Sequence, residues 1–167
     1  MSIFPYINSN VRQLVAYQPG KPISETAREL GLNPEDIVKL ASNENAMGPS
    51  PLAIKAMQET AAGMHIYPDG ASFELRQKIA QMHGVEFAQT AVGNGSSELI
   101  ELLCHACLRP GVELVAAQYS FAMYRLCCKL FDAQYVEVPN KADWSHDLQA
   151  MLQAGFGGGV VFSEVDE

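Results

Sequence analysis

The sequence contains no run of 18 or more apolar residues, and residues 1–10 have neither a basic segment nor a long apolar stretch. A membrane-spanning helix needs about 20 apolar residues, and a secretory signal needs a basic start followed by an apolar segment. The sequence therefore predicts no association with a membrane and a protein that stays in the cytoplasm.

Basic residues are also few. The 11 Lys and Arg residues are outnumbered by 19 Asp and Glu residues, which gives a net charge of -8 and a pI near 4.9. No run of Lys or Arg interrupts this balance, so the electrostatic footprint of a nucleic-acid-binding protein is missing. The composition excludes nucleic acid as an expected partner and favours small-molecule chemistry.

Cysteine is scarce for a disulfide-stabilised protein, because the four cysteines Cys104, Cys107, Cys127 and Cys128 lie in two apolar segments. We expect reduced thiols packed in a core. Cys104, His105 and Cys107 offer a metal-binding alternative, but on one helix His105 points away from the two cysteines, and no second ligand pair follows at zinc-finger spacing. No metal site is predicted.

What is present is an ordinary globular composition of 167 residues, with 48% hydrophobic and 18% charged residues. Residues 1–22 are rich in proline, which discourages regular structure, and we expect an extended N-terminal arm there. Residues 23–167 show no internal repeat and no linker, and are expected to form one body.

Periodicity and capping signals place alternating elements along this body. Helices are predicted at residues 24–30, 51–62, 72–83, 97–108, 121–131 and 145–154. Strands are predicted at residues 37–41, 90–92, 112–117, 135–138 and 160–162. Such alternation indicates parallel strands joined by right-handed helical crossovers, and therefore an α/β layered architecture.

Several residues are expected to begin or end these helices. Thr26 and Glu29 have capping-box spacing, Ser50 followed by Pro51 is a typical helix start, and Ser145 can cap the last helix. Gly31, Gly63 and Gly84 stand where helices should stop.

The segment VGNGSSELI (residues 92–100) joins a predicted strand to a predicted helix through two glycines and two serines. Glycines let the backbone approach an oxyanion, and the first-turn N–H groups and the helix dipole attract negative charge. The segment lacks the lysine of a Walker loop and has only part of a dinucleotide fingerprint, so a monophosphate suits it better. A serine-capped glycine-rich turn without a ligand is the alternative interpretation.

Four segments resemble motifs of histidinol-phosphate aminotransferases and occur in the family's order. They are KLASNEN with GPSP after it (residues 39–51), YPDG (67–70), GNGSSELI (93–100) and SFAMYR (120–125). The resemblance extends from residue 5 to about residue 162. It implies the first part of the large domain of a fold-type I pyridoxal-phosphate transferase, a mostly parallel sheet flanked by helices that is incomplete in this chain.

The resemblance further implies transfer of an amino group between L-histidinol phosphate and 2-oxoglutarate, in histidine biosynthesis. It implies the cofactor pyridoxal 5'-phosphate and a homodimer with its active sites at the subunit interface. An aromatic amino-acid aminotransferase of the same family is one alternative, because substrate choice depends on residues outside this chain. A non-catalytic phosphate-binding α/β protein is another.

The same resemblance assigns cofactor-binding residues. Gly95, Ser96 and Ser97 would hold the cofactor phosphate, although the family more often has an acidic residue at the position of Ser97. Phe121 would lie on the pyridine ring, unless it is only the first core residue of its helix. Tyr67 would reach the cofactor phosphate of the neighbouring subunit, unless it is only a turn residue.

Residues in two other segments match positions that line the family's substrate pocket, namely Tyr17, Asn43, Glu44 and Asn45. The alternative for the two asparagines is local hydrogen bonding within a turn. Tyr17 has the alternative role of a packing anchor in the arm.

A transaminase of this kind needs a lysine that binds the aldehyde of the cofactor as a Schiff base. The family's lysine is expected downstream of residue 167, and the six lysines of this chain match no such motif: Lys21, Lys39, Lys55, Lys78, Lys129 and Lys141. No catalytic residue is therefore predicted in this chain, which by itself is expected to be inactive and to leave sheet edges and apolar faces uncovered.

Overall fold

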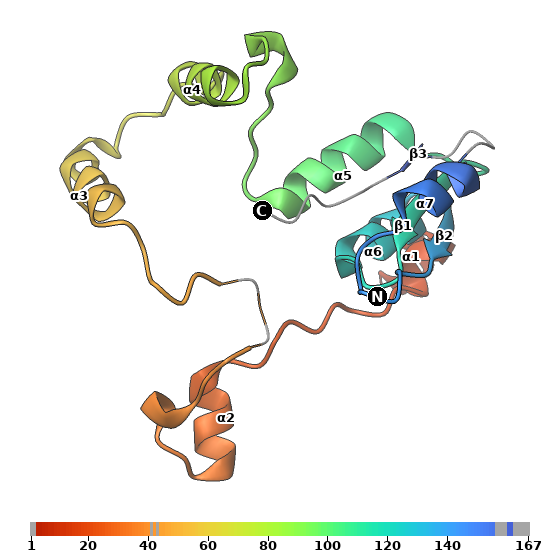
Figure 1. The fold of residues 1–167 in the computed structure, drawn as a ribbon, viewed down its shortest axis with the longest axis horizontal. Coiled ribbons are helices and arrows are strands. Elements are labelled where there is room, and N and C mark those ends of the chain that lie inside the picture. Colours follow the sequence, from red (N-terminus) through yellow and green to blue (C-terminus); the bar gives the residue numbers. More distant parts are fainter. Residues whose placement is uncertain (1–2, 41, 43, 156–159, 162–167) are drawn as a thin grey trace. The chain divides into compact units, whose positions relative to one another are not determined.

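The structure is a computed structural model that describes residues 3–40, 42, 44–155 and 160–161. The chain divides into two compact units (Figure 1). The first unit comprises Met1–Ala16 and Ala91–Glu167, and the second comprises Tyr17–Thr90.

The first unit contains a parallel sheet with the strand order β2-β1-β3. Its strands are β1 (Glu113–Ala117), β2 (Gln134–Val138) and β3 (Val160–Val161). The central strand β1 is almost wholly buried, because Leu114, Val115, Ala116 and Ala117 are at most 1% exposed. The strands predicted at 112–117 and 135–138 and their parallel pairing are confirmed.

Helices pack on both faces of β1. They are α5 (Ser96–Cys107), α6 (Ala122–Leu130) and α7 (Leu148–Ala154). Successive strand residues point to opposite faces, so Leu114 and Ala116 join a core cluster with α5 and α6, whereas Val115 and Ala117 join a second cluster with Met151 of α7. This arrangement is the layered α/β architecture that the sequence predicts.

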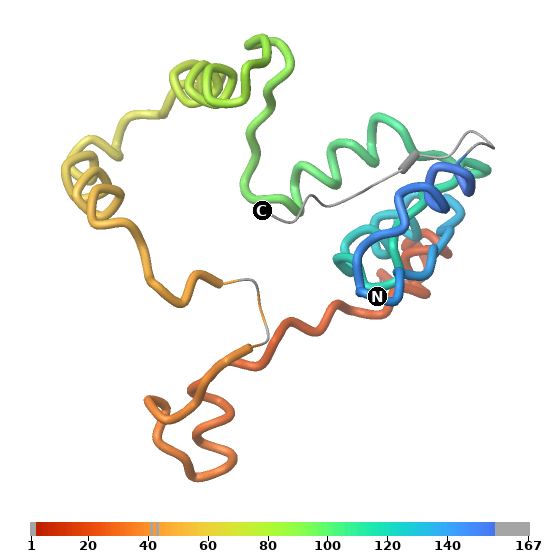
Figure 2. The backbone as a smooth tube through the Cα atoms, viewed as in Figure 1, coloured from red at the N-terminus to blue at the C-terminus, as the bar shows by residue number. Residues whose placement is uncertain are grey.

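The N-terminal arm contains two short helices, η1 (Phe4–Tyr6) and α1 (Ser9–Arg12), where an extended segment was expected. The side chain of Asn10 donates to the carbonyls of Lys129 and Leu130 at 3.1 and 2.7 Å, and Lys129 Nζ donates to the Gln13 carbonyl at 2.8 Å. The last carbonyls of a helix lack intrahelical donors. Asn10 of α1 donates to two such carbonyls, and these hydrogen bonds hold α1 against the end of α6 (Figure 2).

The regular elements among the described residues of the second unit are all helices. Its elements are α2 (Ile23–Leu30), η2 (Pro34–Asp36), α3 (Pro51–Thr60), η3 (Ala61–Gly63), α4 (Phe73–His83) and η4 (Phe87–Gln89). The strands predicted at 37–41 and 90–92 are wrong for all their described residues. A strand needs a neighbour to satisfy its backbone, and the described part of this unit supplies none.

Arg76 connects α4 to η4. Its Nε donates to the Thr90 carbonyl at 3.0 Å, its Nη2 donates to the Phe87 carbonyl at 3.2 Å, and its guanidinium lies 4.1 Å from the centre of the Phe87 ring. Residues 87–90 therefore fold back onto α4, which explains why Thr90 is buried without belonging to a strand.

The helix boundaries follow the predicted stop signals better than the predicted caps. Gly31 and Gly84 adopt left-handed φ values of 66° and 64° at the ends of α2 and α4. The capping box predicted from Thr26 and Glu29 is wrong, because Pro22 is the N-cap of α2. Among the described residues, no helix is both long and apolar enough to span a membrane.

Candidate functional site

The loop before α5 adopts a conformation that favours glycine. Gly95 is the N-cap of α5 and has φ 86° and ψ 169°, a region that residues with a side chain rarely occupy. An added Cβ at Gly95 would meet no neighbouring atom within 4 Å, so the backbone conformation, and not lack of space, requires glycine there.

The first turn of α5 presents amide groups without intrahelical acceptors. Leu99 N–H is the group that donates to the Gly95 carbonyl, at 3.5 Å, so the amides of Ser96, Ser97 and Glu98 precede the first helical hydrogen bond. No side chain of the described residues caps this terminus. The exposed Ser96 and half-buried Ser97 add hydroxyls, and the resulting group of donors can bind an anion.

The Glu98 carboxylate folds back over the loop. Its Oε2 accepts hydrogen bonds from the backbone N–H of Asn94 and from Asn94 Nδ2, the second at 3.1 Å. A Cβ added to Gly93 would lie 2.8 Å from the same oxygen. A side chain at 93 would therefore displace the Glu98 carboxylate from its place over the loop, so glycine is favoured there for a different reason from the one at Gly95.

Phe121 is the N-cap of α6, half-buried, and it packs against the core cluster shared by α5, α6 and β1. The residues before it are fixed at the carboxyl end of β1, because Ser120 Oγ donates to the Ala117 carbonyl at 2.7 Å. The same unit thus holds Gly95, Ser96, Ser97 and Phe121. The core interpretation of Phe121 agrees with this packing, and it leaves the ring partly exposed.

Tyr67 belongs to the second unit and is 98% exposed. The turn after it is formed by Asp69, whose carboxylate accepts from the Phe73 N–H at 2.8 Å and the Ala71 N–H at 2.9 Å. These hydrogen bonds, that of Phe73 first, lower the pKa of Asp69 below its ordinary value of 3.8. The turn lies at residues 69–72, two residues later than the predicted 67–70, because the Ser72 N–H donates to the Asp69 carbonyl at 3.0 Å. Tyr67 precedes this turn and is exposed.

The residues predicted to line a substrate pocket also belong to the second unit. Glu44 Oε1 accepts from Lys39 Nζ at 2.9 Å. Asn45 makes a local turn, because its Oδ1 accepts from the Met47 N–H and its Nδ2 donates to the Gly48 carbonyl, each at 3.0 Å. The turn interpretation of Asn45 thus agrees with its contacts. Tyr17 is 49% exposed, and Asn43 lies outside the described residues.

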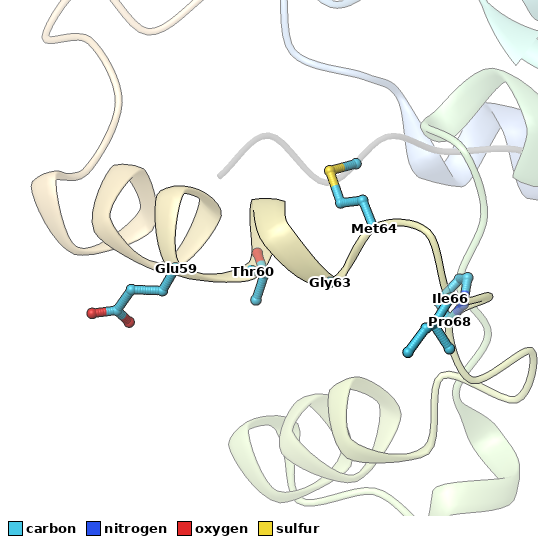
Figure 3. Close-up of a pocket in the computed structure, with 6 residues that line it drawn as sticks. All are labelled: Glu59, Thr60, Gly63, Met64, Ile66 and Pro68. Carbon is cyan, nitrogen blue, oxygen red and sulfur yellow. The ribbon is translucent and has the colours of Figure 1, made fainter.

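A hollow of about 450 Å³ lies along the end of α3 and the segment that follows it, lined by Glu59, Thr60, Gly63, Met64, Ile66 and Pro68. The Glu59 carboxylate and the Met64 thioether point away from each other (Figure 3). Binding sites have polar groups that converge on a ligand, so this hollow lacks the geometry of a site although Tyr67 belongs to the same stretch of chain.

The cysteines have the packing expected of core thiols. Cys104, Cys127 and Cys128 are buried and Cys107 is half-buried, and all four are free. Burial raises the pKa of Cys104 to about 12 and that of Cys128 to about 11. Such thiols are protonated at neutral pH and make poor nucleophiles.

Reasoning from the sequence missed two residues of the loop, Asn94 and Glu98. Their spacing of four residues is the available signal, since residues i and i+4 meet on a helix. Asn94 precedes the helix, however, so the contact depends on the loop conformation that Gly93 and Gly95 permit.

The comparison with protein families agrees with this geometry. The model of the family described as aminotransferase class I and II matches residues 35–155. The chain belongs to this family, and the resemblance inferred from its four motifs is confirmed.

Curated relatives are similar over nearly the whole chain. A histidinol-phosphate aminotransferase of Akkermansia muciniphila is 65% identical over 154 residues, which are 92% of this chain and 42% of that protein. Histidinol-phosphate aminotransferase 1 of Thiobacillus denitrificans is 48% identical over 145 residues, which are 87% of this chain and 38% of that protein. The chain therefore spans about two fifths of the length of these relatives.

Solved structures show the same fold. The histidinol-phosphate aminotransferase of Sinorhizobium meliloti, determined in complex with pyridoxal 5'-phosphate, superposes with a TM-score of 0.74 at 21% identity, covering 89% of this chain and 39% of that one. The predicted fold class is confirmed: the chain forms part of the α/β large domain of a fold-type I transferase.

Proposed function

We propose that the protein to which this chain belongs is a pyridoxal-phosphate-dependent aminotransferase that exchanges an amino group between L-histidinol phosphate and 2-oxoglutarate, in histidine biosynthesis. The observation that carries this proposal is the 65% identity over 154 residues to a protein of that name. The same proposal makes residues 1–22 an arm and residues 23–167 part of the cofactor-binding domain, and places the protein in the cytoplasm.

The residues of the α5 loop fit the cofactor phosphate. The amides of Ser96 and Ser97 and their hydroxyls donate, Gly95 has the backbone conformation that leaves them accessible, and an added Cβ there would meet nothing within 4 Å. No basic side chain is needed for such a cradle, because the helix dipole contributes about half a positive charge. Ser97 would bind the phosphate through its hydroxyl and its backbone amide.

Bound pyridoxal phosphate would supply the electron sink for amino transfer. The residues of this chain would bind and orient it. Phe121, whose half-buried ring is anchored on the core, is proposed to cover one face of the cofactor ring and to exclude water from it. The helix terminus would fix the phosphate and so set the position of the ring.

Five further residues are proposed to act at the site of a homodimer, namely Tyr67, Tyr17, Asn43, Glu44 and Asn45. Tyr67 would reach the cofactor phosphate of the neighbouring subunit. The support is the exposure of the Tyr67 ring, 98%, just before a turn that Asp69 holds rigidly. Glu44, paired with Lys39, would face the substrate. The substrate phosphate would be bound by residues outside this chain.

The test is a steady-state assay of the full-length protein with 2-oxoglutarate and either L-histidinol phosphate or phenylalanine. We expect kcat/KM to be higher for histidinol phosphate by a factor on the order of 10⁴, because a site built for a phosphate leaves polar groups unpaired when that group is missing. A preference for phenylalanine would indicate an aromatic aminotransferase. A protein without turnover, and without a cofactor absorbance that borohydride removes, would be a non-catalytic binder.

A further inference from the structure

We propose that Glu98 is a positioning residue, which holds residues 93–97 in the conformation that binds the phosphate. The inference rests on the proposed function and assigns a role within that site to a side chain that does not itself touch the phosphate. Its basis is the set of contacts made by a single oxygen atom, Glu98 Oε2.

The first contacts connect the loop to the helix. Asn94 lies outside α5, and Glu98 lies in its first turn. The backbone N–H and Nδ2 of Asn94 both donate to Glu98 Oε2. Hydrogen bonds to a charged group are stronger than neutral ones, so the carboxylate ties the chain before Gly95 to the helix after it.

The second contact concerns Gly93. A Cβ at this position would lie 2.8 Å from Glu98 Oε2 and 3.1 Å from Leu99 Cδ2. The Glu98 carboxylate thus lies in the space that a side chain at 93 would need. Gly93 and Glu98 are therefore a matched pair, and the close approach of the carboxylate to the backbone depends on the glycine.

These contacts determine which amides can bind an anion. The Asn94 N–H is occupied by Glu98, which leaves the amides that follow Gly95. A carboxylate so close to the cradle opposes a phosphate electrostatically, so Glu98 contributes through the shape of the loop and not through its charge. Both hydrogen bonds are accepted by one oxygen of Glu98. Glutamine, whose amide has one carbonyl oxygen, can therefore replace glutamate at this position.

The test compares Glu98→Ala with Glu98→Gln in the full-length protein, using pyridoxal phosphate and inorganic phosphate as probes of equilibrium binding. We expect Glu98→Ala to weaken binding of both roughly tenfold, the effect of losing a hydrogen bond to a charged group. Glu98→Gln should bind at least as tightly as the wild type. The matched control is Glu101→Ala, which removes the same charge from the same helix at an exposed residue paired with His105.

A second measurement uses hydrogen exchange at the Asn94 amide without any ligand. Exchange should be fastest in Glu98→Ala, intermediate in Glu98→Gln, whose neutral amide oxygen is a weaker acceptor, and unchanged in Glu101→Ala. In a double-mutant cycle, Gly93→Ala should weaken phosphate binding in the wild type by displacing the Glu98 carboxylate, and should weaken it less in the Glu98→Ala background, where only the contacts with Leu99 remain.

The outcomes separate the inference from the function on which it rests. A wild-type protein that binds neither probe would overturn both. Binding in the wild type that Glu98→Ala leaves unchanged, additive losses in the cycle, or binding lost equally in Glu98→Gln and Glu98→Ala would overturn the positioning role alone.

Discussion

Asp69 shows how one side chain can form a turn. Its two carboxylate oxygens accept the amides of Ala71 and Phe73, the second of which is the first residue of α4. The carboxylate therefore fixes both the start of the helix and the turn that follows Tyr67. Because these hydrogen bonds need the charged form, their effect depends on pH.

The pKa of Asp69 in the folded chain lies below its ordinary value of 3.8, because the two amides, that of Phe73 most, stabilise the carboxylate. A lowered pKa means that the stabilisation is fully present above the pKa of the unfolded chain and is lost as the pH falls through the folded value. We expect NMR titration of the Asp69 carboxyl to give a pKa below 3.8. Asp69→Asn should remove this part of the acid dependence of helix content.

The prediction concerns a fully exposed group, so other carboxylates provide the internal comparison in the same titration. A pKa for Asp69 at or above that of an unperturbed aspartate would contradict it. So would a variant Asp69→Asn whose helix content fell with pH as steeply as that of the wild type.

The α5 loop shows how far single residues could be predicted from the sequence. Glycines and serines at a strand-to-helix junction indicate an anion cradle through general properties of the backbone, and Gly95 has the expected kind of φ value. The contact of Glu98 with Asn94 was not predictable in this way. A side-chain contact across a loop depends on the dihedral angles of that loop, which the residue types restrict but do not determine.

Helix α7 illustrates the same limit for whole elements. The sequence predicts a helix beginning at Ser145, whereas α7 begins at Leu148 and is capped by Asp147, whose carboxylate accepts from the Ala150 N–H at 3.0 Å. Ser145 instead donates to the carboxylate of Asp143 at 2.7 Å. Both residues are good N-caps, so the pattern alone could not select between them.

Asp147→Ala is expected to lower the free energy of unfolding by about 1 kcal/mol, the usual contribution of a helix N-cap. Ser145→Ala is the matched control and should cost clearly less. Urea unfolding of the full-length protein and its two variants measures both values. Equal losses, or a larger loss for Ser145→Ala, would show that the helix begins where the sequence pattern indicates.

Strands were predicted correctly where a partner exists. The apolar run of β1 is buried on both faces between β2 and β3 and their covering helices, which is the environment its composition indicates. The segments at 37–41 and 90–92 have similar local patterns without a neighbouring strand in the described residues. Pairing is a long-range property, and a local pattern cannot report it.

For the whole molecule, two observations lead to one expectation: the chain spans only part of the length of its relatives, and many of its apolar side chains are exposed. The chain spans about two fifths of the length of its relatives. No residue of α3 is buried, and its Leu52 and Met57 are 79% and 61% exposed. Apolar surface of this kind is normally covered. We expect further chain or a partner to cover it in the functional protein.

Transaminase activity is also expected to need more than these 167 residues. None of the six lysines matches the motif of a cofactor-binding lysine. Lys39, Lys129 and Lys21 are bound to Glu44, the Gln13 carbonyl and Glu29. A polypeptide of residues 1–167 should therefore form no covalent, borohydride-reducible adduct with pyridoxal phosphate at the cofactor site, and should not convert histidinol phosphate with 2-oxoglutarate.

The assay follows product formation and the mass of the borohydride-treated chain, with the full-length protein as the positive control. Non-specific modification of exposed lysines such as Lys78 is separated from site-directed modification by competition with inorganic phosphate, which occupies the cradle. Turnover by the 167-residue polypeptide would mean that one of its own lysines serves the reaction. Because no described residue of the α5 loop is a lysine, that lysine would have to come from another element or a second copy of the chain.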